Sequence, residues 1–78
     1  MMGTSITVIR HAEAGDRDRW TASDDLRPLT RGGRRQAERI AEHMVNEPFV
    51  QVMSSPFIRC VQTVSPLAAL HGLPVELR

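Results

Sequence analysis

Ile6-Thr7-Val8-Ile9 is a short β-branched run that ends directly on Arg10 and His11. A run of this length and composition predicts a buried strand over residues 6–10. Open α/β folds bind their ligands at the carboxyl edge of a parallel sheet. We therefore expect Arg10 and His11 to lie at that edge and to form part of a functional site.

A first helix is predicted from the cap residue Thr30 to about residue 46. Its apolar stripe has helical spacing and consists of Ala37, Ile40, Ala41 and Met44. Before this helix, residues 12–29 are polar and predict a loop. A loop of this length inside a compact domain is usually functional.

A second helix is predicted to begin with Ser55 as the capping residue and Pro56 at the first helical position. Gly72 is expected to end it, and Pro66 to kink it or divide it in two. The short apolar runs on either side, residues 49–53 and 73–77, predict a second and a third strand.

This order of elements is βαβαβ, which implies parallel strands joined by right-handed crossovers. The expected fold class is α/β, a three-layer α/β/α arrangement with a mainly parallel sheet, present here as an incomplete portion. With 78 residues the chain can form one small domain, residues 1–78.

The composition argues against several classes of partner. Nine acidic residues are interspersed with ten arginines, for a net charge of +1, so we expect neither nucleic acid nor membrane to be bound. The single cysteine, Cys60, permits no internal disulfide and fits a reducing compartment. Since the sequence shows no signal peptide or membrane span, we expect a cytoplasmic location.

The predicted topology brings two motifs to one sheet edge. One strand ends at Arg10 and His11, and the next leads into the helix that carries Arg59 in its first turns. The free backbone amides of a helix start favour an anion. Two guanidiniums, one imidazole and a helix amino terminus around one point predict a phosphate pocket.

The residue types suggest the chemistry of this pocket. An imidazole that donates one ring N–H to a backbone carbonyl presents the lone pair of its other nitrogen, which makes His11 the candidate nucleophile. Arg10 and Arg59 would neutralise the phosphoryl oxygens in the transition state, with a bidentate geometry that lysine cannot reproduce.

Three motifs in one order resemble the amino-terminal half of a histidine phosphatase, most closely the SixA-type phosphohistidine phosphatases: Arg10-His11-Ala12-Glu13-Ala14, Leu26-Arg27-Pro28-Leu29-Thr30, and Ser54-Ser55-Pro56-Phe57-Ile58-Arg59-Cys60-Val61-Gln62-Thr63. The resemblance implies that His11 is transiently phosphorylated and that Arg10 and Arg59 bind phosphate. It also implies that Arg27 reaches the pocket. Glu13 could orient a substrate or make a structural hydrogen bond in its loop.

Two departures from the family pattern stand out. Ala12 replaces the usual glycine, which would cost about 1 kcal/mol if a left-handed backbone were required there. The family also needs a second histidine after a later strand, and many members need a general acid, neither of which is found here. We expect the 78 residues to be a partial form, inactive or nearly so alone and prone to self-association.

The substrate is expected to be a phosphorylated protein or a small phosphorylated molecule. Phosphohistidine proteins are preferred, because phosphohistidine carries a good leaving group. The alternatives are a phosphatase or mutase acting on small phosphate esters, and an inactive fragment that binds phosphate or a partner. His43 is expected on a helix surface and His71 as a helix cap, and no spacing predicts a metal or organic cofactor.

Overall fold

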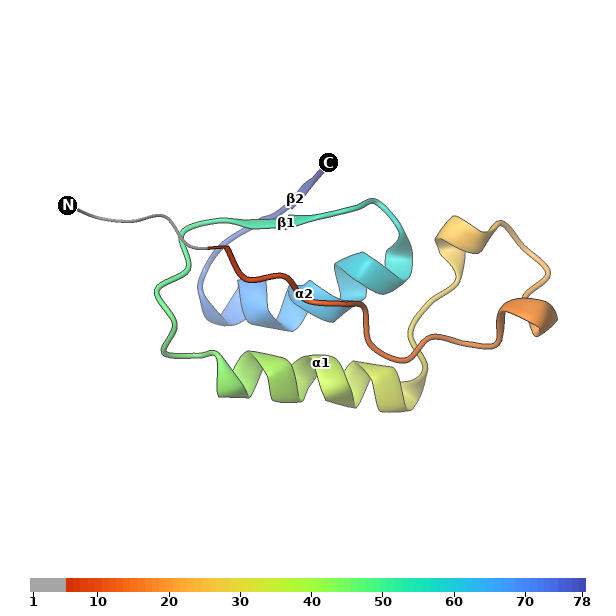
Figure 1. Ribbon diagram of the computed structural model, residues 1–78, viewed down its shortest axis with the longest axis horizontal. Coiled ribbons are helices and arrows are strands. Elements are labelled where there is room, and N and C mark those ends of the chain that lie inside the picture. Colours follow the sequence, from red (N-terminus) through yellow and green to blue (C-terminus); the bar gives the residue numbers. More distant parts are fainter. Residues whose placement is uncertain (1–5) are drawn as a thin grey trace.

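The computed structural model describes residues 6–78. Two helices and a short parallel sheet give an α/β fold, which confirms the predicted class (Figure 1). The elements in chain order are the 3₁₀ turns η1 (Arg17–Arg19) and η2 (Asp24–Leu26), helix α1 (Arg31–His43), strand β1 (Val52–Ser54), helix α2 (Ile58–Leu70) and strand β2 (Val75–Leu77).

Strands β1 and β2 pair in parallel, and α2 is the crossover that joins them. Val52 lies opposite Val75, and Ser54 lies opposite Leu77. The backbone amide of Arg78 donates to the carbonyl of Ser54 at 2.9 Å, which continues the ladder beyond the paired residues. The second and third predicted strands are therefore found, each with three residues, and β1 ends one residue later than predicted.

The structure contains no strand over residues 6–10, so this prediction is wrong. The side chains of Ile6 and Val8 are 85% and 86% exposed, whereas a buried strand would hide at least one face. A strand exists only through its ladder of hydrogen bonds to a neighbour. In the described residues that ladder joins β1 to β2 and leaves 6–10 outside it.

Helix α1 begins as its sequence predicts. The hydroxyl of Thr30 accepts a hydrogen bond from the backbone amide of Gly33 at 3.0 Å, which satisfies one free amide of the first turn. A Cβ atom added to Gly33 would lie 2.0 Å from the carbonyl oxygen of Glu13. Only glycine lets the helix start approach the backbone after His11 this closely.

Helix α2 begins later than predicted. Phe57 is its N-cap and makes no side-chain capping bond, and the helix proper starts at Ile58. Ser55 and Pro56 therefore do not form the cap. Since the ladder bond from Arg78 holds Ser54 in the sheet, residues 55–57 are used to turn the chain from β1 into α2 (Figure 1).

The end of α2 matches the expectation, and its middle decides between two alternatives. Pro66 lies inside one continuous helix, so of the predicted kink or division the structure excludes the division. Gly72 has a φ of 64°, and the amide of Leu73 donates to the carbonyl of Ala68 at 2.9 Å, as in a helix-ending αL turn.

Small residues let the two helices and the loop after His11 pack closely. Ala12, Leu29 and Ala37 form a buried cluster, and Ala41 and Ala68 are 2% exposed each. No non-glycine residue in the described chain has a positive φ, so Ala12 carries no left-handed strain. Its methyl group instead fills the core between α1 and the loop. None of the described helices is long and apolar enough to cross a membrane.

Candidate phosphoryl-binding site

The imidazole of His11 has the arrangement expected of a nucleophile. Its Nδ1 lies 2.8 Å from the carbonyl oxygen of Ala12. Since a carbonyl can only accept, Nδ1 is the protonated nitrogen and donates this bond. Nε2 then keeps its lone pair, and the residue is exposed to solvent.

His11 lies between two hollows in the surface. The larger, of about 590 Å³, is lined by Arg10, His11 and Glu13 on one side and by Gln36 and Arg39 of α1 on the other. The smaller, of about 250 Å³, brings His11 next to the end of β1 and the first turns of α2; it is lined by Ile9, His11, Met53, Ser54, Ser55, Cys60, Thr63 and Val64.

Arg27 and Arg59 meet at one carboxylate. The Nε of Arg27 donates to Oδ1 of Asp24 at 3.0 Å, and Nη2 of Arg59 donates to Oδ2 of Asp24 at 3.0 Å. Arg59 also donates from Nη1 to the carbonyl oxygen of Asp24 at 2.8 Å. Both arginine side chains are buried, at 8% and 9% exposure, so Arg27 is not a solvated loop residue.

These contacts lower the pKa of the Asp24 carboxyl below its usual value of 3.8, first through the hydrogen bond from Arg27 and then through that from Arg59. Burial opposes the shift. The carboxylate is therefore ionised near neutral pH and is the anion to which both arginines are bound.

The guanidinium of Arg59 has further capacity to donate. Its central carbon lies 4.7 Å from the centroid of the Phe57 ring, a cation–π contact that covers one face. Its Nε is buried and has no acceptor among the described residues. A buried positive donor without a partner is unusual and is typical of a site prepared for an anion.

Thr63 connects the loop of His11 to the helix of Arg59. Its hydroxyl accepts from the amide of Ala12 at 3.0 Å and donates to the carbonyl of Arg59 at 2.6 Å. Gln62 makes an equivalent link, because its Oε1 accepts from the amide of Leu29 at 2.8 Å. Both residues belong to a motif identified in the sequence, which assigned neither of them a role. Their position one helical turn after Arg59 is the feature that could have indicated this link.

Glu13 is engaged in structural contacts. Its Oε1 accepts from the Thr30 hydroxyl at 2.7 Å, and its carbonyl accepts from the Thr30 amide at 3.0 Å. Its own amide donates to Oε1 of Gln36 at 2.9 Å. Of the two roles considered for Glu13, the structure shows the structural hydrogen bond.

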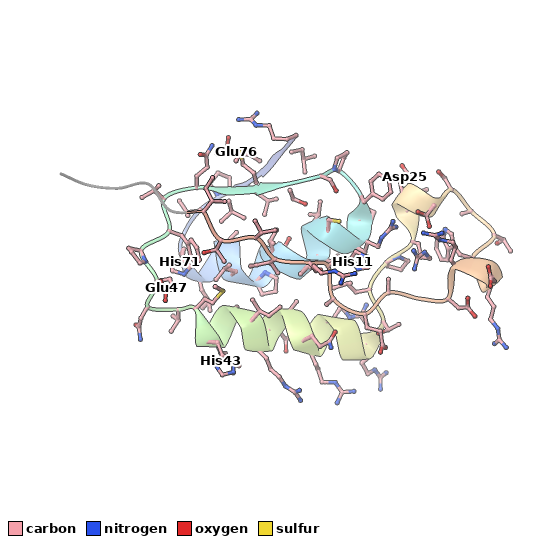
Figure 2. All side chains as sticks on the ribbon, viewed as in Figure 1. His11, Asp25, His43, Glu47, His71 and Glu76 are labelled. Atoms are coloured by element: carbon pink, nitrogen blue, oxygen red, sulfur yellow. The ribbon has the colours of Figure 1, made fainter. Side chains whose placement is uncertain are left out.

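The remaining histidines lie away from this region (Figure 2). His43 is exposed on α1, as predicted. His71 is the C-cap of α2, but its Nε2 bonds to the carbonyl of Met44 at 3.0 Å and its ring meets Phe49 edge-on at 5.2 Å. It therefore joins the ends of the two helices. In residues 6–78 no three metal-ligating side chains cluster.

The structure thus brings the predicted residues into two groups. Arg10, His11 and Glu13 line one hollow, and Arg27 and Arg59 share Asp24. Thr63 links the loop of His11 to the helix of Arg59 through two hydrogen bonds. The convergence of Arg10, His11 and Arg59 on a single phosphoryl group remains a prediction.

Comparison with known proteins assigns the family. The sequence model of the histidine phosphatase superfamily (branch 1) matches residues 6–78. The chain belongs to the histidine phosphatase superfamily.

Solved structures of phosphohistidine phosphatases share its fold. The protein histidine phosphatase SixA complexed with tungstate aligns with a TM-score of 0.72 and 30% identity over 90% of this chain and 46% of that one. The putative phosphohistidine phosphatase SixA from Agrobacterium tumefaciens gives a TM-score of 0.71 and 26% identity over 90% and 47%. The chain therefore spans less than half the length of these structures.

Curated relatives are longer still. An 8-oxo-(d)GTP phosphatase of Mycolicibacterium smegmatis is 36% identical over 82% of this chain and 20% of its own length. The transcription factor tau 55 kDa subunit of Saccharomyces cerevisiae is 33% identical over 99% of this chain and 20% of its own length. The chain spans about a fifth of each.

Proposed function

We propose that these residues belong to a phosphatase in which His11 accepts the phosphoryl group of the substrate. The observation that carries the proposal is the 2.8 Å bond from Nδ1 of His11 to the Ala12 carbonyl, which leaves the lone pair of Nε2 free on an exposed ring. Membership of the histidine phosphatase superfamily and the likeness to SixA structures support it.

The reaction has two displacements. Nε2 attacks phosphorus, an N–P bond forms, and the bond to the leaving group breaks with its electron pair going to the leaving atom. Water then attacks phosphorus, the N–P bond breaks, and inorganic phosphate leaves. Arg10 and Arg59 would neutralise the charge on the phosphoryl oxygens in both steps.

Phosphohistidine in a protein is the substrate that we propose. Its leaving group is an imidazole nitrogen, which needs less protonation than an alkoxide. Among the described residues, the carboxylate that lies beside His11 is that of Glu13, and it accepts a hydrogen bond from the Thr30 hydroxyl instead of facing a leaving group. The SixA structures support the same choice.

A small phosphate ester or anhydride is the second candidate. It is favoured by the 36% identity to an 8-oxo-(d)GTP phosphatase, a protein named for a nucleotide substrate. Rates on a phosphohistidine peptide and on nucleotide and sugar phosphates, measured side by side, separate the two. Faster turnover of the esters would favour the second candidate.

Phosphoryl trapping tests the nucleophile. Labelled substrate followed by rapid quenching should give an adduct that is labile in acid and stable in base, as a phosphohistidine is. His11→Ala should abolish the adduct. His43→Ala is the matched control, since His43 is exposed on α1 and should leave labelling unchanged. Label on His43 or His71 would refute the assignment of His11.

We also propose that the 78 residues alone turn over slowly or not at all. The family resemblance implies a second histidine, and neither His43 nor His71 can supply it, since both lie away from His11 (Figure 2) and His71 is also bonded to Met44. Loss of one donor to a developing oxyanion costs about 10² to 10³ in rate. Full activity of a 78-residue monomer would overturn this proposal.

A further inference from the structure

The carboxylate of Asp24 is bound as a phosphoryl group would be. Each of its two oxygens accepts from a different arginine, Arg27 or Arg59, both at 3.0 Å. Two guanidiniums that converge on one anion form a fork geometry suited equally to carboxylate and phosphate. The two arginines therefore form an anion site, and its occupant is a side chain of the same protein.

The occupant is more exposed than the site. The side chains of Arg27 and Arg59 are 8% and 9% exposed, while that of Asp24 is 43% exposed. Asp24 begins the 3₁₀ turn η2, which has no buried residue. An exposed residue on a short turn can leave with little loss of packing, whereas the two arginines cannot.

The arginines also have anchors that do not depend on the Asp24 carboxylate. Arg27 donates from Nη1 to the carbonyl oxygen of Gly15, and Arg59 packs on the Phe57 ring. Arg59 in addition keeps a buried Nε that has no acceptor within residues 6–78. The site would therefore persist after Asp24 leaves, with spare donors for a third oxygen.

We propose that Asp24 is an internal competitor of the phosphoryl group, which displaces it from Arg27 and Arg59 and releases turn η2. This inference rests on the proposed function and adds a regulatory contact to the same site. The lowered pKa of Asp24 supports it, because the competitor is ionised near neutral pH. A phosphoryl group carries more charge and three acceptor oxygens, so it can replace a carboxylate.

The first test measures the dissociation constant of inorganic phosphate for the intact protein. Asp24→Asn keeps the shape of the side chain and removes its charge, so phosphate should bind about fivefold to tenfold more tightly. Asp25→Asn is the matched control: Asp25 is the next residue, is exposed and bonds to Ser23 instead of the arginines (Figure 2). Its effect should stay below about twofold, which is the part due to net charge alone.

A second test uses the wild-type protein and needs no variant to fold. The amides of Leu26 and Arg27 donate within η2, to Ser23 at 3.0 Å and to Asp24 at 3.1 Å. Their hydrogen exchange should become faster when phosphate binds, because the turn is released. Slower hydrogen exchange of these amides, or weaker phosphate binding by Asp24→Asn, would show that Asp24 positions the arginines. Either result would refute the proposal that Asp24 competes with the phosphoryl group.

The outcomes separate this inference from the proposed function. If Asp24→Asn binds phosphate more tightly but His11 is never phosphorylated, the competitor role of Asp24 stands and the nucleophile role of His11 is refuted. If phosphohistidine is trapped at His11 but Asp24→Asn binds phosphate no more tightly than wild type, the nucleophile role stands and the competitor role is refuted. If neither wild type nor Asp24→Asn binds phosphate, both the competitor role of Asp24 and the proposed phosphoryl site are refuted.

Discussion

The backbone amide of Ala12 donates a 3.0 Å hydrogen bond to the hydroxyl of Thr63, 51 positions later in the chain. Thr63 is 1% exposed, so neither group can turn to water instead. The same hydroxyl donates to the carbonyl of Arg59. One side chain therefore fixes the peptide beside the candidate nucleophile relative to the helix that carries Arg59.

Thr63→Val should lower the free energy of unfolding by about 1 to 3 kcal/mol, the cost of leaving a buried amide without an acceptor. Valine has nearly the same shape, so the loss is due to the hydroxyl. Urea unfolding of Thr63→Ser provides the comparison, because serine keeps the oxygen and removes one methyl group. If Thr63→Val is as stable as wild type, the hydrogen bond to Ala12 does not contribute to the free energy of unfolding.

Gly33→Ala should destabilise the protein by about 1 to 3 kcal/mol, because the new Cβ would lie 2.0 Å from the carbonyl oxygen of Glu13 and the backbone must move. Gly32→Ala tests the neighbouring position on the same helix turn. Its Cβ would make only ordinary contacts, with the side chains of Glu13 at 3.5 Å and Thr30 at 3.8 Å, so the helix should gain up to about 1 kcal/mol. Thermal unfolding should show a lower melting temperature for Gly33→Ala and a higher one for Gly32→Ala. Equal changes in the two variants would contradict the close approach of Gly33 to Glu13.

The stability that Asp24 contributes should depend on pH. Its pKa is lowered in the folded protein, so the contribution is fully present above the unfolded value of about 3.8 and is lost as pH falls through the folded value. Wild type should therefore be more stable than Asp24→Asn near neutral pH and lose this advantage in acid. A difference between wild type and Asp24→Asn that does not depend on pH would exclude an ionic origin.

Arg59→Lys keeps the positive charge and loses the fork that reaches two oxygen atoms of Asp24. We expect it to cost about 1 to 3 kcal/mol of transition-state stabilisation, measured as the change in kcat/KM of the complete protein. Arg35→Lys, at an exposed position on α1, should have no effect. If Arg59→Lys turns over substrate as fast as wild type, Arg59 does not stabilise the transition state.

Local features of the fold could be predicted from the sequence, and features that need a distant partner could not. The cap at Thr30 and the stop at Gly72 depend on a few neighbouring residues, and both are found. Residues 6–10 have the composition of a strand, yet a strand also requires a hydrogen-bonded neighbour that composition does not specify. The turn that delays α2 arises because the sheet holds Ser54.

The site shows the same division. The hydrogen bond that orients His11 joins adjacent residues, and a bond to some backbone carbonyl was expected from the residue type, without its acceptor. The partner of Arg59 is Asp24, which lies 35 residues earlier in a loop that sequence reasoning left without assigned contacts. In a run of interspersed acids and arginines, the sequence does not indicate which acid will pair with which arginine. Asp24 is therefore recognised as the partner of Arg59 only in the folded chain.

The loop that contains Asp24 is closed at its base by the antiparallel bridge of Ala14 and Leu29 and by the bond from the Gly15 amide to Pro28. Turn η1 at its tip has no buried residue. Because doubling the length of a flexible loop costs only about 0.6 kcal/mol of closure entropy, evolution can lengthen or replace η1 almost freely. An insertion at η1 would therefore leave the bridge at the base of the loop, and with it the residues around His11, in place.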